Sequence, residues 1–180
     1  MKFCYANRRM TLYPNSVDPW DLSPEDYTDE FLVKVKDMGF DALEIGSDTL
    51  DKTGGSEKSI LEFGKKIKGF GLDIGCIRSG GTLTEAKNGP ENIKKMDKSI
   101  NYAKITGAEV VNGAISAPIR YPGSPEGSSY ASGTGWIKSQ DSSKEATMWI
   151  YEHLSKIYKE SCDKASENNV NISVEIHQNS

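Results

Sequence analysis

The sequence predicts an α/β fold built on parallel strands, and three observations support this. Five short apolar segments alternate with helical patterns. A glycine lies shortly before three of these segments, and most of the segments end in a polar residue. Strands that alternate with helices imply parallel pairing through right-handed crossovers. The architecture is then either a doubly wound sheet or a (β/α)₈ barrel.

The expected strands are the apolar segments at about 2–6, 42–45, 72–77, 109–112 and 171–176. A glycine stands shortly before the second, third and fourth of them, at Gly39, Gly71 and Gly107. Glycine takes the left-handed conformation without a Cβ clash, which suits the residue just past a helix end. Each glycine therefore marks a helix stop that leads into a strand.

Four helices are expected between these strands. Ser23-Pro24-Glu25-Asp26 offers a cap, an N1 proline and an acidic first turn for a helix that continues to Met38. Ser56 begins a second helix, Gly89-Pro90-Glu91 begins a third, and a fourth runs from about Ser143 to Glu167. Residues 1–180 are expected to form one domain.

Charge and composition exclude several classes of protein. The net charge is −4, from 22 Lys plus Arg against 26 Asp plus Glu. The sequence shows no stripe of basic residues that could follow the phosphate backbone of a nucleic acid. No apolar run approaches the roughly 20 residues that a membrane span needs, and the start does not resemble a signal peptide. The three cysteines are scattered without a C-x-x-C pair. A cytoplasmic location, without nucleic-acid or membrane partners, is expected.

The fourth strand is followed by an unusually long connection. Residues 113–143 are rich in Gly, Ser and Pro and are expected to form a long loop at the active-site face. A second insertion, from Asn7 to Leu22, would bring Trp20 to the same rim. Both architectures place their active sites at this end of the strands, so two long loops there predict a pocket.

Polar residues near the strand ends are the candidates for chemistry: Glu44, Arg78, Asn112, Glu175 and His177. Glu175 and His177 share one face of the last strand, so they could bind a divalent metal together, or one could move a proton. The alternative is a solvated edge strand. His177 could also brace Glu175 or contact substrate. Glu44, Asn112 and Arg78 could bind hydroxyls or an anion, although structural roles for them remain open.

Three local patterns resemble the xylose isomerase-like TIM barrels, the family of sugar phosphate isomerases and epimerases: Met38-Gly39-Phe40-Asp41-Ala42-Leu43-Glu44-Ile45, Gly71-Leu72-Asp73-Ile74-Gly75 and Ser173-Val174-Glu175-Ile176-His177. The resemblance implies an α/β fold of (β/α)₈ TIM-barrel type that is incomplete, with about five strands present. It implies that Glu175 is both a metal ligand and an acid/base. The family's remaining ligands come from strands six to eight, so a truncated, inactive chain is expected.

The resemblance implies a divalent-metal-dependent sugar or sugar phosphate isomerase or epimerase that works through an enediolate. Mn²⁺ or Mg²⁺ is the expected cofactor, and a small carbohydrate the expected substrate, bound by His177, Asn112, Glu44, Arg78 and Trp20. Two alternatives stay open. One is a C-glycoside deglycosidase-type lyase subunit acting on a 3-keto-sugar, and the other an inactive fragment or carbohydrate-binding module. A homo- or hetero-oligomer is compatible with each of these.

Overall fold

Five parallel strands form a single sheet. The structure is a computed structural model that describes residues 2–6, 22–80, 83, 89–115 and 148–176. The strands pair in the order β1-β2-β3-β4-β5, which is also their order along the chain. Their bounds are β1 Cys4–Ala6, β2 Ala42–Gly46, β3 Asp73–Ser79, β4 Val110–Ile115 and β5 Asn171–Ile176. The predicted α/β class, parallel pairing and about five strands are confirmed.

The helices follow the predicted alternation, with two differences. Their bounds are η2 Pro24–Asp26, α1 Asp29–Asp37, α2 Ser47–Lys52, α3 Glu57–Gly69, α4 Gly89–Thr106 and α5 Met148–Glu167. Ser23 caps only the short 3-10 turn η2, whereas α1 starts later, where the Thr28 hydroxyl accepts the Phe31 N–H. The sequence analysis also missed α2. None of the helices in the described ranges is long and apolar enough to cross a membrane.

All three predicted helix stops are confirmed. Gly39, Gly71 and Gly107 have φ angles of 88°, 72° and 77°, in the region that side chains disfavour. At each position the chain turns directly from a helix into the next strand. The predicted α3 start is also confirmed, because the Ser56 hydroxyl accepts the Ser59 N–H at 3.1 Å.

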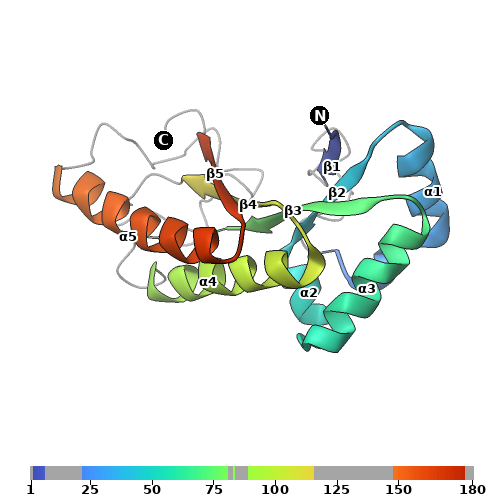
Figure 1. Ribbon diagram of the computed structural model, residues 1–180, viewed down its shortest axis with the longest axis horizontal. Coiled ribbons are helices and arrows are strands. Elements are labelled where there is room, and N and C mark those ends of the chain that lie inside the picture. The colour runs from blue at the N-terminus through green and yellow to red at the C-terminus, as the bar shows by residue number, and fades with distance from the viewer. Residues whose placement is uncertain (1, 7–21, 81–82, 84–88, 116–147, 177–180) are drawn as a thin grey trace, which may run out of the picture.

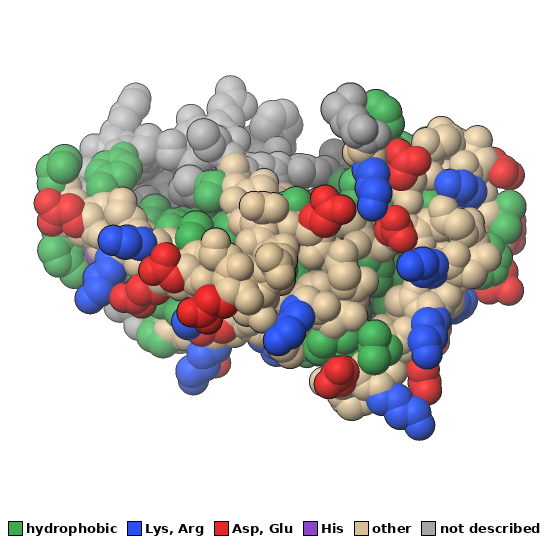
Figure 2. Space-filling view, viewed as in Figure 1, with side chains coloured by type: hydrophobic (Ala, Val, Ile, Leu, Met, Phe, Trp, Pro, Cys, Tyr) green, Lys and Arg blue, Asp and Glu red, His purple; other side chains and the backbone are tan. Residues whose placement is uncertain are grey.

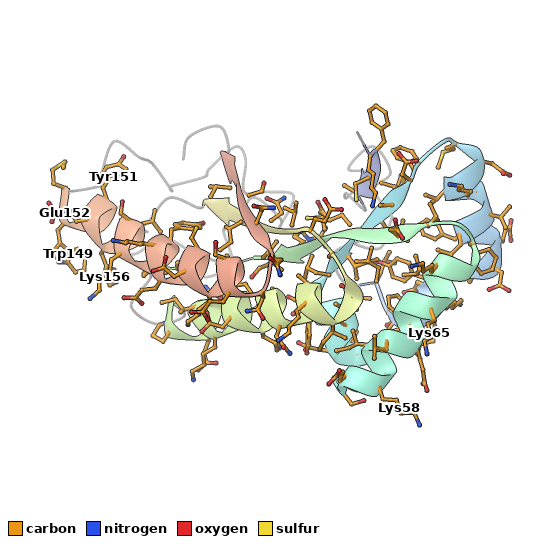
Figure 3. The ribbon with its side chains drawn as sticks, in the orientation of Figure 1. Lys58, Lys65, Trp149, Tyr151, Glu152 and Lys156 are labelled. Carbon is orange, nitrogen blue, oxygen red and sulfur yellow. The ribbon has the colours of Figure 1, made fainter. Side chains whose placement is uncertain are left out.

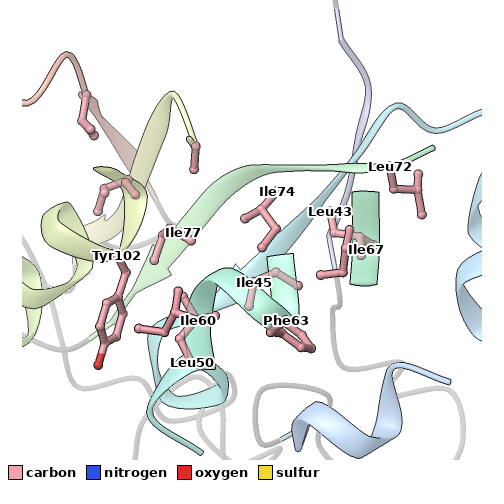
Figure 4. Packing of buried hydrophobic residues seen from close by; sticks show 14 of the residues in the cluster. Leu43, Ile45, Leu50, Ile60, Phe63, Ile67, Leu72, Ile74, Ile77 and Tyr102 are labelled. Atoms are coloured by element: carbon pink, nitrogen blue, oxygen red, sulfur yellow. The ribbon is translucent and has the colours of Figure 1, made fainter. Parts of the chain in front are cut away.

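The helices α2 to α5 line one face of the sheet (Figure 1). The core lies between these two layers. Leu43, Ile45, Ile74 and Ile77 of the strands meet Leu50, Ile60, Phe63 and Ile67 of α2 and α3 in one buried cluster (Figure 4). In the second half of the chain, Val111 joins the same cluster with Met96 and Ile100 of α4. The core residues of β2, β3 and β4 therefore point toward the helices.

Candidate functional site

Three candidate residues that the structure describes, Glu44, Arg78 and Asn112, lie on the sheet face opposite α2 to α5, which we call the inner face. A Cβ atom at Gly113 would lie 2.8 Å from Met96 Cε and 3.6 Å from Tyr158 Oη, so position 113 faces α4 and α5. Strand side chains alternate, so Asn112 belongs to the inner face. Glu44 lies between the core residues Leu43 and Ile45 and belongs to the same face.

Three polar residues on adjacent strands form a continuous line across the inner face, which we call the polar row. Arg78 of β3 is in register with Asn112 of β4, and Asn112 is in register with Ser173 of β5. Neighbouring strands lie about 4.8 Å apart, so these residues are direct neighbours. The Ser173 hydroxyl donates to Asn112 Oδ1 at 3.4 Å. Hydrogen-bonding groups thus extend over three strands at one level of the sheet.

Arg78 forms a buried ion pair with Glu44. Its Nη1 donates to Glu44 Oε1 at 3.1 Å, and the two side chains are only 8% and 10% exposed. The register shifts between Leu43 and Glu44, where β2 pairs with β3, so that Glu44 is in register with Cys76 rather than Gly75. A charged group that is buried away from water needs a partner of opposite charge, and Glu44 and Arg78 are such partners for each other. Both residues were predicted as separate contacts for a substrate, and the structure brings them together.

Two cysteine thiols lie close to this ion pair. Burial, with a smaller contribution from the Glu44 carboxylate, raises the pKa of Cys4 to about 11 and that of Cys76 to about 12. Cys4 is exposed as a residue, but its sulfur packs against the backbone of β3, 3.1 Å from where a Gly75 Cβ would lie. A raised pKa keeps both thiols mainly protonated at physiological pH, which slows their reaction as nucleophiles.

Glu175 is positioned by β5, in backbone register with Ala114. Position 175 comes two residues after Ser173, so strand alternation assigns it to the inner face as well, one level nearer the carboxyl end of the strand than the polar row. Its side chain lies outside the described part of the chain, as do all of His177 and Trp20 and residues 116–147. The predicted loop at 113–143 therefore stays a prediction, except that β4 continues through its first residues to Ile115.

The described residues do not by themselves make a metal centre. Within the described ranges, no three His, Cys, Asp or Glu side chains come together to hold an ion. Glu44 is already paired with Arg78. The role of Glu175 as a metal ligand stays a prediction, because its side chain lies outside the described part of the chain.

Ser173 is the residue that the sequence analysis missed as a candidate. Its signal was present, because it shares the strand face of Glu175 and stands beside Asn112 once the register is known. Exposed aromatic side chains lie elsewhere, in the first turns of α5, where Figure 3 shows Trp149 and Tyr151. The Trp149 ring stacks on His153 with a centroid distance of 5.2 Å. They are not part of the polar row.

Two surface hollows lie on the outer faces of helices. One is lined on α3 by Glu57, Lys58, Leu61, Glu62 and Lys65, and the other on α4 by Glu91, Asn92, Lys94, Lys95 and Lys98. Lys58 and Lys65 extend outward from α3 (Figure 3). Each hollow is formed by a single helix and lined mainly by charged side chains, as is typical of a solvated surface, so neither competes with the inner face.

Solved structures show the same arrangement of strands and helices. A 3-keto-D-glucoside 4-epimerase from E. coli matches with a TM-score of 0.63 and 16% identity, over 97% of this chain and 55% of its own. A magnesium complex from Mycobacterium smegmatis, described as a xylose isomerase-like TIM barrel protein, matches at 0.60 and 19%, over 99% and 56%. The chain has a partial TIM-barrel fold.

A third match is D-psicose 3-epimerase with D-tagatose from Clostridium cellulolyticum H10, with a TM-score of 0.57 and 17% identity, over 96% of this chain and 51% of that one. The chain thus spans about half the length of the structures that it resembles. No family profile and no curated relative matches its sequence. The fold predicted from three short motifs is confirmed by structure alone.

Proposed function

We propose that this chain contributes to the site of a divalent-metal-dependent sugar isomerase or epimerase. The polar row carries the proposal, because it places hydroxyl-binding groups of Arg78, Asn112 and Ser173 side by side on the inner face. Three neighbouring donors and acceptors suit the successive hydroxyls of a small carbohydrate. The fold neighbours named as epimerases support the same substrate class. The site would belong to a cytoplasmic enzyme.

Glu175 is assigned the proton transfer. Its carboxylate takes a proton from the carbon next to the substrate carbonyl, and the bond electrons move to the carbonyl oxygen to give an enediolate. A proton returned to the same carbon from the other side completes an epimerisation. A proton returned to the former carbonyl carbon completes an isomerisation, and neither outcome needs an external oxidant.

The proposal includes Mn²⁺ or Mg²⁺, with Glu175 as the ligand that this chain supplies. When bound, such an ion stabilises negative charge on the enediolate oxygens. One neighbour is described in complex with magnesium. Further substrate contacts from His177 and Trp20 are also proposed, since both are expected near the carboxyl ends of the strands.

A second candidate is a lyase subunit that acts on a 3-keto-sugar. The observation that favours it is the match to a 3-keto-D-glucoside 4-epimerase, whose described substrate carries the same keto group. Loss of a proton next to that group would precede either epimerisation or expulsion of an aglycone. The two candidate reactions share the loss of this proton. They differ in the next step, because the lyase expels an aglycone whereas the epimerase returns a proton to the sugar.

Deuterium incorporation tests the shared step. The chain is incubated in D₂O with Mn²⁺ and either D-fructose or a 3-keto-glucoside, and the carbon next to the carbonyl is followed by NMR. Extended to the length of the barrels that it matches, the protein should incorporate deuterium, and Glu175→Gln in that protein should lose at least about 100-fold of the rate. Sugar binding without any exchange would contradict the enzyme proposal and favour a carbohydrate-binding module.

A further inference from the structure

The edge strand β1 contacts the sheet through side chains that extend past its neighbour β2. Among the described strands, β1 pairs with β2 alone, and Cys4 is in register with Ala42. The Cys4 sulfur nevertheless lies 3.1 Å from where a Cβ atom at Gly75 of β3 would stand. Ala42 has a small side chain and Gly75 has none, so the thiol reaches the third strand across the inner face. β1 is therefore held by β3 as well as by β2.

Lys2 extends past β2 in the same way, and it carries a charge. Its ammonium nitrogen lies 3.2 Å from Asp73 Oδ2 and 3.6 Å from Glu109 Oε1. Asp73 is the first residue of β3, and Glu109 directly precedes β4. We call Lys2, Asp73 and Glu109 the clasp. Because the two carboxylates belong to different strands, the clasp ties the start of β1 to the starts of both β3 and β4.

The other described contacts of β1 are modest. The strand has three residues, and the Phe3 side chain directly before it is 58% exposed. The Phe3 carbonyl accepts the N–H groups of Asp41 and Ala42 at 2.9 and 3.2 Å. The Tyr5 ring packs edge to face on Phe40, with a centroid distance of 5.2 Å. Segments with little buried apolar surface open locally before the rest of a fold does. The clasp is therefore a substantial part of what keeps β1 in place.

We propose that β1 is a salt-sensitive latch at the edge of the inner face, which the clasp keeps closed at low ionic strength. All three side chains of the clasp are exposed, so dissolved salt screens its ion pairs strongly. When the latch opens, Cys4 leaves the inner face, and β2, which carries Glu44, becomes the edge of the sheet. Ionic strength thereby changes how open the inner face is, whichever reaction takes place there.

Amide hydrogen exchange measures the opening of the latch. The Asp41 and Ala42 amide protons are bonded to the Phe3 carbonyl, so they exchange when β1 leaves β2. Lys2→Met removes the cation of the clasp, and Lys2→Arg keeps it. Lys94→Met is the matched control, because Lys94 is also exposed and pairs with Glu91 inside α4. Exchange is followed by NMR at about 0.01 M and about 1 M NaCl, where the Debye length is about 30 Å and about 3 Å.

In wild type, the two amide protons should exchange about two- to fivefold faster at high salt, because exposed ion pairs contribute modestly. Lys2→Met should already exchange at the faster rate at low salt and should lose the salt dependence. Lys2→Arg and Lys94→Met should behave as wild type does. The Val170 amide, which is bonded to the Ala165 carbonyl, should be unaffected throughout. Equal exchange of Asp41 and Ala42 in wild type and Lys2→Met at low salt would overturn the proposal.

Alkylation of Cys4 by iodoacetamide tests whether the opened strand also leaves the inner face. The rate for Cys4, measured relative to that of exposed Cys162, should rise about two- to fivefold in Lys2→Met at low salt. Loss of a nearby cation alone would favour the protonated thiol and slow the reaction, so a faster rate requires better access to the sulfur. Faster amide exchange with no faster alkylation would show that Cys4 stays against β3, which would also overturn the proposal.

Discussion

Arg78 and Glu44 show how far single residues could be interpreted from the sequence. Each was a candidate because it stands near the expected end of a strand, and the structure places Glu44 in β2 and Arg78 in β3, while their roles in chemistry stay predictions. Their pairing could not be predicted, because it depends on the register shift between β2 and β3. Such a shift leaves no mark on local periodicity, since it arises from how two strands 34 residues apart meet.

The two inner-face cysteines give a prediction at the same scale. With pKa values of about 11 and 12, Cys4 and Cys76 are thiolate at pH 8 only to about one part in a thousand and one in ten thousand. Exposed Cys162 on α5 should therefore be alkylated first by iodoacetamide, Cys4 later and Cys76 last. Peptide mass spectrometry over time measures this order.

Unfolding in urea supplies the control for the thiols. There the three rates should converge, because burial and the Glu44 charge no longer act on Cys4 and Cys76. If Cys76 of the folded protein reacts as fast as Cys162, its thiol does not lie in the buried environment described above.

At the scale of elements, the glycines that end helices were predictable because each position requires a positive φ angle, which glycine adopts readily. The case of α2 is the opposite. Its sequence Ser47-Asp48-Thr49-Leu50-Asp51-Lys52 has one large apolar residue, too few for a helical pattern. The helix forms because Leu50 enters the core and because α4 holds its acidic residues. Contacts distant in sequence, rather than propensity, decide this element.

Replacing Gly107, which ends α4, should lower the free energy of unfolding. Nothing lies within 4 Å of a Cβ added there, so Gly107→Ala is disfavoured only by its φ of 77° and should lose about 1–2 kcal/mol of unfolding free energy. Gly69→Ala is the matched control, since that position is also open but helical and should gain up to about 1 kcal/mol. Urea denaturation followed by circular dichroism measures the change in unfolding free energy, which should be negative for Gly107→Ala and positive for Gly69→Ala. An equal change for both variants would contradict this explanation.

The contact between α2 and α4 should depend on pH through Asp51. Its carboxylate accepts from Tyr102 Oη at 2.5 Å and Lys98 Nζ at 2.6 Å. Burial opposes ionisation, but these two hydrogen bonds outweigh it and lower the pKa of Asp51 below its usual 3.8. A lowered pKa stabilises the fold above the unfolded value, and that stabilisation is lost as pH falls through the folded pKa.

Asp51→Asn should therefore destabilise the protein by about 0.5–1 kcal/mol at pH 6, a modest amount because the carboxylate is partly exposed. The difference from wild type should shrink toward zero near pH 2, as chemical denaturation across this range would show. Asp37→Asn, which removes an exposed carboxylate of α1, is the matched control. A difference that grows on acidification would show that the sign of the Asp51 shift is wrong.

For the whole molecule, the sequence predicted the fold better than it predicted the site. Alternating elements and three helix stops were enough for a parallel α/β sheet, because these features are local. The site is formed by residues from strands that are far apart in sequence. Which of these residues are neighbours across the sheet is known only once the register of the strands is known. Acidic and basic side chains are interleaved over the outer helix surfaces, in keeping with the small net charge of −4 (Figure 2).

The central claim is that the inner face, and not a helix surface, binds carbohydrate. Titration of the ¹⁵N-labelled chain with D-fructose in the presence of Mg²⁺, followed by two-dimensional NMR, tests it most directly. The account predicts the largest shifts at Arg78, Asn112, Ser173 and Glu175, and none at Lys58 and Lys65 on α3. Shifts confined to the α3 or α4 hollows, with none along the polar row, would contradict it.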